Sequence, residues 1–301
     1  MLRHGAELTD PSPDSAIHVV LTFDDDFWAP AYTVMRSICL TTFRRKDLVF
    51  HLLHDDLRPE RAADLERITE EFGARVARYE LSDNAEFNAI CRQLPVDRRL
   101  HVVMYARLLL DRILPAGIGR VIYLDSDTMA LTAIEHLYEQ EMDGHPIAAV
   151  SDPRRTFNMM GRDMREKREI FDPASPYFNS GVMLIDLPKF ASFDVAARLE
   201  ELKQRGIIQK LYFDQDILNL IFAGRWKPLH WRFNVMEPRV AHQALDPYIV
   251  HYTGTNRPWK LFSTVAFGRP YRHVMTNELF CRYLRHRAKQ FWFKKLGLMK
   301  R

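Results

Sequence analysis

Two aspartates, Asp125 and Asp127, follow the apolar segment 121–124. Side chains alternate along a strand, so we expect both carboxylates to point to one side and Ser126 to point away. Two neighbouring carboxylates repel each other unless a positive charge lies between them. A divalent cation that carries a phosphorylated ligand would supply that charge, because hard cations take oxygen ligands. The alternative is an acidic turn, since Asp and Ser are common turn residues.

Four further polar segments also follow apolar runs. They are residues 24–26 (DDD), 178–181 (FNSG), 214–216 (DQD) and 251–259 (HYTGTNRPW). In an open α/β sheet, ligands bind beyond the carboxyl ends of the strands. We therefore expect these segments to gather with Asp125 and Asp127 at one edge of a sheet.

The elements that must position these segments can be read from the apolar pattern. Runs of strand length predict strands, and apolar residues at helical spacing predict helices. The predicted strands are 17–23, 48–53, 74–79, 121–124, 147–150 and 181–185, and the predicted helices are 31–43, 60–72 and 104–114. Alternating strands and helices predict an α/β fold with a mainly parallel sheet.

Composition sets the class of protein. The 301 residues are 47% hydrophobic and 27% charged, which is typical of a globular protein. No apolar run approaches the roughly 18 residues that a membrane span needs. The three cysteines form no C-x-x-C pair, which favours a reduced, cytoplasmic location. We expect a flexible leader over residues 1–16, one domain over residues 17–270 and a basic C-terminal tail over residues 271–301.

The tail holds much of the positive charge. Residues 278–301 contain eight Lys and Arg against one Glu, while the whole chain has a net charge of +4. Phe280, Leu284, Ala288 and Phe291 fall on one helical face, which indicates either an anchor for anionic lipid or a surface helix packed on the domain. The basic segment 154–168 is either a solvated surface or a mobile flap beside an anionic ligand.

Six motifs together resemble the family 8 glycosyltransferases, which include lipopolysaccharide galactosyltransferases and glucosyltransferases as well as glycogenin. They are TFDDDF (22–27), YARLLL (105–110), VIYLDSD (121–127), YFNSGVMLIDL (177–187), FDQDILN (213–219) and HYTGTNRPW (251–259). The resemblance implies a GT-A nucleotide-diphospho-sugar transferase fold: a mixed, mostly parallel sheet flanked by helices, here with a basic helical tail.

The resemblance also implies a metal site of Asp125, Asp127 and His251. It would hold Mn2+, with Mg2+ as the alternative ion, between the phosphates of a nucleotide sugar. Carboxylates, an imidazole and phosphate oxygens form a mixed ligand set that suits Mn2+. Without the resemblance, a histidine in the apolar run 249–252 reads more readily as a core residue.

The remaining site residues are implied in the same way. Thr22, Asp24 and Asp26 match positions that hold the uridine, although position 26 is more often Asn. The other donor-binding positions are Arg107, Asp125, Ser126, Asp127, Asn179, Gly254 and Arg257, and the catalytic positions are Gln215, Asp214 and Asp152. Many family members have Lys where this chain has Arg257, and Gly181 would let the backbone approach the site closely.

The implied reaction is transfer of galactose or glucose from a UDP-sugar to a hydroxyl of a glycan or glycolipid, with retention at the anomeric carbon. It would serve lipopolysaccharide or surface polysaccharide synthesis in the cytoplasm or on the inner face of the plasma membrane. Gln215 is a neutral amide and a poor nucleophile, which favours attack from the leaving-group face. No nucleic-acid partner is expected.

Two alternatives remain open at this point. Residues 124–128 (LDSDT) also resemble the acidic motif of haloacid-dehalogenase-like phosphatases, in which the first Asp attacks phosphate. That family usually begins its core with the motif, whereas several strand-helix units precede it here. The other alternative is a non-catalytic UDP-sugar-binding protein on the same scaffold.

Overall fold

The computed structural model describes residues 16–95, 102–152, 170–171, 175–211 and 213–296. The predicted leader, apart from Ala16, lies outside these residues. So do the basic segment 154–168 and the last five residues of the tail.

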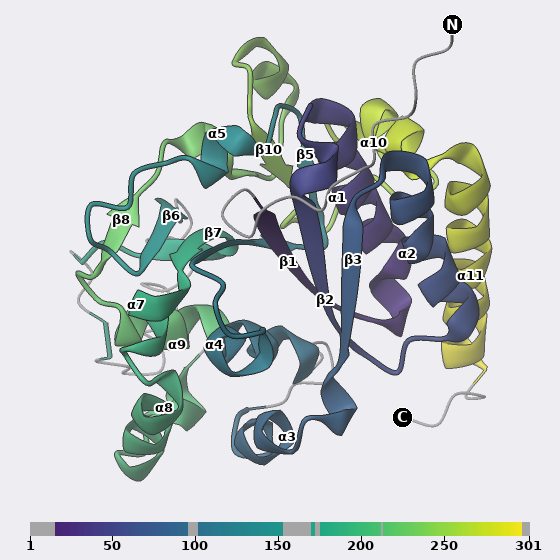
Figure 1. Ribbon diagram of the computed structural model, residues 1–301. Coiled ribbons are helices and arrows are strands. Elements are labelled where there is room, and N and C mark those ends of the chain that lie inside the picture. Colours follow the sequence, from purple (N-terminus) through teal and green to yellow (C-terminus); the bar gives the residue numbers. More distant parts are fainter. Residues whose placement is uncertain (1–15, 96–101, 153–169, 172–174, 212, 297–301) are drawn as a thin grey trace, which may run out of the picture.

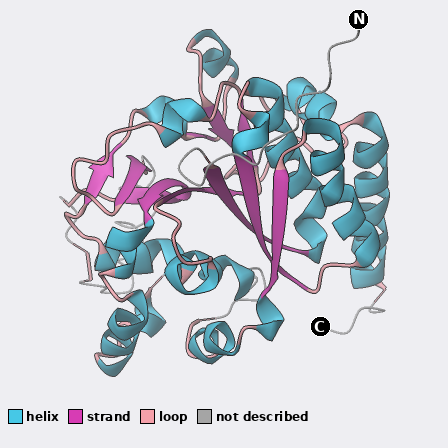
Figure 2. Ribbon diagram, viewed as in Figure 1, coloured by secondary structure: helices cyan, strands magenta, loops and turns pink. Residues whose placement is uncertain are grey.

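A seven-stranded sheet forms the centre of the molecule, in the order β3-β2-β1-β4-β7-β6-β8 (Figures 1 and 2). The strands are β1 (Ile17–Asp24), β2 (Leu48–Asp55), β3 (Arg75–Glu80), β4 (Arg120–Asp125), β6 (Ile147–Ser151), β7 (Phe178–Asp186) and β8 (Trp226–Pro228). Only β7 runs antiparallel to its neighbours, β4 and β6; the other pairs are parallel. The prediction of a mixed, mostly parallel sheet is confirmed.

A small second sheet joins distant parts of the chain. Its order is β5 (Thr128–Ala130), β10 (Ile249–His251) and β9 (Val235–Met236). Only two residues separate the end of β4 from the start of β5, and Thr128 pairs with His251 in the antiparallel register. The second sheet therefore brings His251 next to the turn that carries Asp127.

Helices cover both faces of the large sheet (Figure 1). One face carries α1 (Trp28–Thr41), α2 (Pro59–Phe72), α5 (Glu135–Tyr138), α10 (Gly268–Met275) and α11 (Asn277–Lys295). The other carries α3 (Ala85–Cys91), α4 (Leu110–Ile113), α7 (Leu187–Ala191), α8 (Val195–Gln204) and α9 (Phe213–Ile221). Two apolar cores result, one on each side of the sheet.

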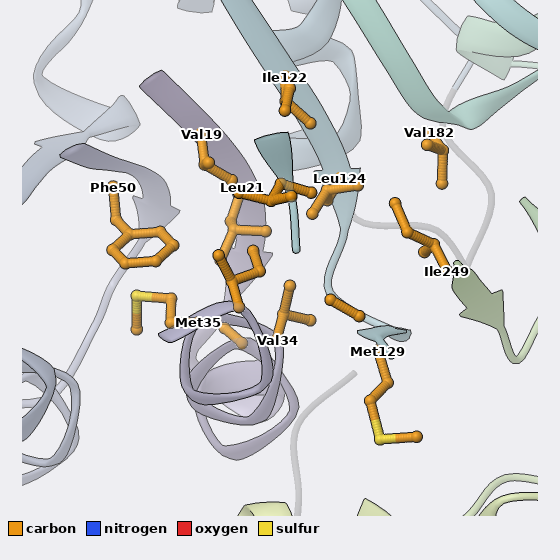
Figure 3. Close-up of a cluster of buried hydrophobic side chains, with 14 of the residues drawn as sticks. Val19, Leu21, Val34, Met35, Phe50, Ile122, Leu124, Met129, Val182 and Ile249 are labelled. Carbon is orange, nitrogen blue, oxygen red and sulfur yellow. The ribbon is translucent and has the colours of Figure 1, made fainter. Parts of the chain in front are cut away.

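Strand alternation builds the first core (Figure 3). Val19 and Leu21 of β1 point toward α1, where Val34 and Met35 are fully buried against them. Burying one such side chain contributes roughly 1.5–3 kcal/mol. This packing fixes the position of β1 relative to α1. It therefore also fixes the position of the acidic segment that follows the strand.

The segment predicted as one helix over 104–114 is broken. Residues Val102–Leu108 form a 3-10 helix, and α4 follows after Leu109, whose φ of −127° is not helical. Val103, Tyr105, Arg107 and neighbouring side chains are buried on more than one side of this segment. Tertiary packing therefore overrides the local helical pattern, and it places Arg107 beneath the end of β4.

The C-terminal helix α11 packs on the domain with its first half. Leu279 and Tyr283 are fully buried, and the Tyr283 ring meets Trp28 edge-on at 5.1 Å between centroids. Phe291 and Trp292 in the second half are exposed. The predicted domain boundary at residue 270 falls within α10, so the tail begins inside packed structure. Among the described residues, no helix has the length and apolar character needed to cross a membrane.

Candidate metal and donor-sugar site

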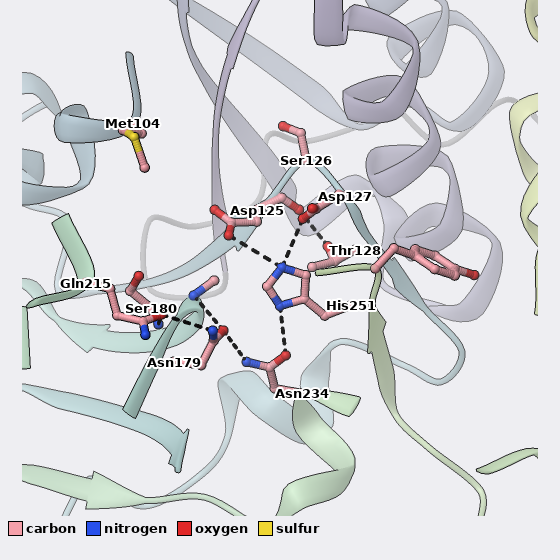
Figure 4. A network of polar contacts seen from close by, with 12 residues as sticks. Met104, Asp125, Ser126, Asp127, Thr128, Asn179, Ser180, Gln215, Asn234 and His251 are labelled. Carbon is pink, nitrogen blue, oxygen red and sulfur yellow. Dashed lines mark hydrogen bonds and ion pairs between the residues drawn. The ribbon is translucent and has the colours of Figure 1, made fainter. Parts of the chain in front are cut away.

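Asp125, Asp127 and His251 converge at the carboxyl end of β4 (Figure 4). Their potential ligand atoms all lie within 4.8 Å of one another. His251 Nε2 is 3.0 Å from Asp127 Oδ1 and 3.5 Å from Asp125 Oδ2. Ser126 points away from this group, and its hydroxyl donates to the carbonyl of Thr22. The structure thus brings the three predicted metal ligands together.

The orientation of the His251 ring is set by Asn234. The other ring nitrogen, Nδ1, lies 3.0 Å from Asn234 Oδ1, and both residues are buried. The Asn234 amide nitrogen donates in turn to Asn179 Oδ1 at 2.8 Å, so Asn234 Oδ1 faces the ring as an acceptor. This network places the proton on Nδ1 and leaves a lone pair on Nε2, as a metal-binding histidine requires.

This arrangement fits a divalent cation. With its proton on Nδ1, His251 directs the Nε2 lone pair at two carboxylates, so three acceptors face one point. Within the described part of the chain, Asp127 Oδ1 is buried and has no hydrogen-bond donor of its own. Acceptors that converge in this way need a cation or an added proton between them. Carboxylate oxygens with one imidazole nitrogen suit Mn2+ better than Mg2+.

Arg257 lies on the opposite side of Asp127. Its guanidinium contacts Asp127 Oδ2 and the carbonyl of Tyr252. Burial opposes ionisation of Asp127, but the positive charge of His251 when its ring is protonated, together with that of Arg257, outweighs burial and holds the pKa of Asp127 below the usual range. Asp127 is therefore a carboxylate at neutral pH and available as a ligand.

Arg107 supplies a second, buried positive charge. Its guanidinium bonds Asp125 Oδ1 at 2.7 Å and Asp214 Oδ2 at 3.1 Å, and it lies over the Tyr123 ring at 4.5 Å. Burial alone would lower the pKa of Arg107, but the two carboxylates raise it. Burial raises the pKa of Asp214, and Arg107 opposes that effect. Arg107 thus holds one oxygen of Asp125 in place and leaves Asp125 Oδ2 facing His251.

Gln215, at the start of α9, is held at both ends of its amide. Its Oε1 accepts from the Asn179 amide at 3.0 Å, and its Nε2 donates to Asp152 Oδ2 at 3.1 Å. Together with Asn234, these residues form a continuous chain of hydrogen bonds from Asp152 to His251. Figure 4 shows the part of this chain from Gln215 to His251. The chain connects the predicted catalytic amide with the predicted metal ligand.

Gly181 lies against the three candidate ligands Asp125, Asp127 and His251, which together form the metal cluster named below. A Cβ at this position would overlap the His251 ring and would stand 2.5 Å from Asp125 Oδ2. The backbone of β7 therefore passes so close to the cluster that only glycine fits. Gly254 has a comparable restriction, because a Cβ there would lie 2.7 Å from Glu237 Oε1.

The residues predicted to hold the nucleoside lie at the end of β1. Thr22 pairs in register with Asp125, and its hydroxyl is 2.6 Å from the Tyr123 hydroxyl. Asp24 closes the strand. Asp26, two residues further on, contacts His286 and Gln290 of α11.

Sequence reasoning missed three residues of this region: Asn234, His286 and Gln290. Asn234 lies between a 3-10 helix and the two-residue strand β9, where no periodic pattern marks it. The sequence places His286 and Gln290 in a basic helix and indicates no separate role for them. Their spacing of four residues, which places both on one helical face, was the available signal.

Comparison with known proteins identifies the family. The model of "Glycosyl transferase family 8" matches residues 18–262. The lipopolysaccharide 1,2-glucosyltransferase of Escherichia coli is 27% identical over 83% of this chain and 75% of its own length. General stress protein A of Bacillus subtilis is 23% identical over 87% of this chain and 94% of its own length. GlyB of Streptococcus pneumoniae is 26% identical, and the match spans 83% of this chain but only 59% of GlyB.

The fold also has a solved counterpart. The crystal structure of the galactosyltransferase LgtC with donor and acceptor sugar analogs superposes with a TM-score of 0.70 and 22% identity, over 86% of this chain and 95% of LgtC. That agreement shows the GT-A fold. Since the family model covers most of the sequence, the chain belongs to glycosyl transferase family 8, a family of sugar-transferring enzymes.

Proposed function

We propose that this protein is a retaining glycosyltransferase that transfers galactose or glucose from a UDP-sugar to a hydroxyl of a glycan or glycolipid. The observation that carries the proposal is the convergence of Asp125, Asp127 and His251 beside Arg257. A metal ion bound there would act as a Lewis acid on the leaving diphosphate. Mn2+ is the preferred ion, and Mg2+ is the alternative.

Arg257 would change partners during the reaction. Its guanidinium is now engaged by Asp127, and it can turn to a diphosphate once a cation neutralises that carboxylate. Arg binds phosphate oxygens with a planar fork of donors, so it would neutralise charge that develops as the diphosphate departs. The centroid of the Trp259 ring lies 5.6 Å from Arg257 Cζ, and this ring would limit the movement of the guanidinium.

Retention follows most simply from attack on the leaving-group face. Gln215 has no ionisable group, and both ends of its amide are already hydrogen-bonded. It would therefore steady the sugar and would not form a covalent bond to it. The departing phosphate oxygen would take the proton of the acceptor hydroxyl. Asp152 and Asp214 would orient sugar hydroxyls, for which carboxylate oxygens are suitable acceptors.

The substrate class is supported by the relatives. Besides the Escherichia coli enzyme, a lipopolysaccharide 1,3-galactosyltransferase of Salmonella typhimurium is 23% identical over 83% of this chain. We propose a role in lipopolysaccharide or surface polysaccharide synthesis in the cytoplasm. The family match across residues 18–262 favours the transferase over the phosphatase alternative.

The test is a panel of UDP-sugars incubated with Mn2+ and scored for slow donor hydrolysis, which needs no knowledge of the acceptor. We expect hydrolysis of one UDP-hexose that a chelator abolishes. Asp127→Ala should abolish it too, while the exposed Asp143→Ala serves as a matched control. Full activity of Asp127→Ala, or of metal-free enzyme, would contradict the metal role.

Turnover of a phosphate ester without any UDP-sugar would favour a phosphatase. UDP binding without hydrolysis or transfer would favour a binding protein.

We further propose that the end of α11 contacts an anionic membrane surface, where a glycolipid acceptor would lie. Phe291, Trp292 and Leu296 are exposed there, among basic side chains. Aromatic and basic residues together suit the lipid interface. Removing residues 278–301 would also remove the buried Tyr283, so Phe291→Ser with Trp292→Ser is the sharper test. Unchanged binding of this variant to anionic vesicles would contradict the proposal.

A further inference from the structure

The C-terminal helix reaches the segment that follows β1. Asp26 Oδ1 accepts from His286 Nε2 at 3.0 Å and from the Gln290 amide, two side chains one turn apart on α11. Thr22 of β1 pairs in register with Asp125, so this segment leaves the sheet at the edge that holds the metal cluster. A helix from the far end of the chain therefore contacts the rim of the proposed donor site.

His286 acts as a bridge in this contact. The Arg61 guanidinium of α2 lies 3.0 Å from His286 Nδ1 and 3.4 Å from His286 Nε2, so Nδ1 is its nearer partner, and a guanidinium can only donate. Nδ1 is therefore the acceptor, and the ring proton lies on Nε2, which donates to Asp26. Arg61 also bonds the Asp25 carboxylate at 2.5 Å and the Asp25 carbonyl. One buried guanidinium thus ties both aspartates to α11.

The helix itself is anchored firmly beside this bridge. Arg282 binds both oxygens of Asp64 at 2.7 and 2.9 Å, and Trp28 donates to Asp64 at 3.1 Å. The Arg61 guanidinium lies over the Trp28 ring at 4.1 Å. These contacts fix the position of α11 along its axis relative to α1 and α2, so His286 is held in place beside Asp26.

The effect on Asp26 is to hold an ionised carboxylate in one orientation. Burial opposes its ionisation, but hydrogen bonds from His286 and Gln290 lower its pKa below the usual range. Among the described residues, the hydrogen bonds to Asp26 all use Oδ1. Oδ2 therefore remains as an acceptor for hydroxyl or N–H donors of a ligand. An ordered acceptor binds more tightly than a mobile one, because less rotamer freedom is lost on binding.

We infer that α11 is part of the donor site, with His286 and Gln290 as positioning residues that hold Asp26 for the nucleoside half of the donor. This inference rests on the proposed function. It predicts that α11 controls donor affinity and not the chemical step, because the side-chain contacts given for Asp26 are with Arg61, His286 and Gln290.

The test compares His286→Ala, Gln290→Ala and the double variant with the wild type. Calorimetry would give the affinity for UDP with Mn2+, and kinetics would give KM and kcat for the UDP-sugar. We expect about tenfold weaker UDP binding in the double variant, the scale of losing hydrogen bonds to a charged group. KM should rise while kcat changes little. His286→Gln, which keeps an N–H donor, should recover much of the affinity, and the exposed Arg285→Ala is the matched control.

A double-mutant cycle separates positioning from loss of fold. In an Asp26→Ala background, His286→Ala should have no further effect on UDP affinity. An equal loss in both backgrounds would show that His286 acts only through stability and would overturn the inference. Unchanged UDP affinity in the double variant would also overturn it. Failure of the wild type to bind UDP would instead overturn the proposed function together with the inference.

Discussion

Asn234 offers a sharp test of the proposed metal site. Asn234→Ala removes the acceptor for His251 Nδ1–H and the donor to Asn179 Oδ1. Freed from Asn234, the ring proton can move to Nε2 and bond Asp127, 3.0 Å away, so the lone pair is lost to the metal. Partners of this kind typically change metal affinity 10- to 100-fold, or about 1.4–2.7 kcal/mol.

The assay is Mn2+ affinity by calorimetry, with and without UDP. Asn234→Asp keeps an acceptor for the His251 ring but loses the donor to Asn179. It should retain Mn2+ binding within severalfold and lower kcat through the Gln215 chain. Asn219→Ala is the matched control, because Asn219 is also a buried asparagine with several hydrogen bonds but lies away from the metal ligands. Mn2+ affinity of Asn234→Ala within twofold of the wild type would refute this account.

Three further predictions address the metal cluster, acid stability and thiol chemistry. Gly181→Ala should abolish Mn2+ binding, because its Cβ would overlap His251; normal Mn2+ titration of a folded variant would contradict this. Burial, aided by His18 and Arg75, lowers the pKa of His51 from 6.5 to about 3, so below pH 6.5 the unfolded chain binds the proton first. The titration of His51 alone should lower the free energy of unfolding by about 1.4 kcal/mol per pH unit as the pH falls from 6.5 toward 3, and urea unfolding of His51→Gln should show a weaker pH dependence between pH 6.5 and 5. One thiol, Cys281, should react quickly with a thiol reagent in the native protein, because burial raises the pKa of the other two cysteines to about 12; two or more fast-reacting thiols would argue against the packing.

Most of the fold could be predicted from the sequence, because apolar residues recur with a period of 2 along the buried faces of strands and 3.6 along those of helices. The β1 and β2 runs, and the apolar spacing of α1 and α2, specify elements that pack against one another locally. The prediction of one helix over 104–114 was wrong because side chains of this segment are buried on more than one side and Arg107 also pairs with the distant carboxylates of Asp125 and Asp214. Local pattern cannot report such partners.

In the candidate site, too, some residues could be predicted from the sequence and others could not. Residues within motifs, such as Asp125 and Asp127, could be named from their order along the chain. Asn234 and His286 could not, because their roles arise from contacts made across long sequence separations: 17 residues from Asn234 to His251 and 260 from His286 to Asp26. Only the packed structure shows which polar side chain orients another.

The small sheet that joins β5 to β10 has a consequence for how the protein matures during synthesis. Asp127 and His251 are 124 positions apart, and they meet only when β10 pairs with β5. Closing so long a loop is a late and entropically costly step. A nascent chain that still lacks β10 on the ribosome therefore contains the two carboxylates but no complete cation site. The order of synthesis alone leaves this group of ligands incomplete until β10 has emerged.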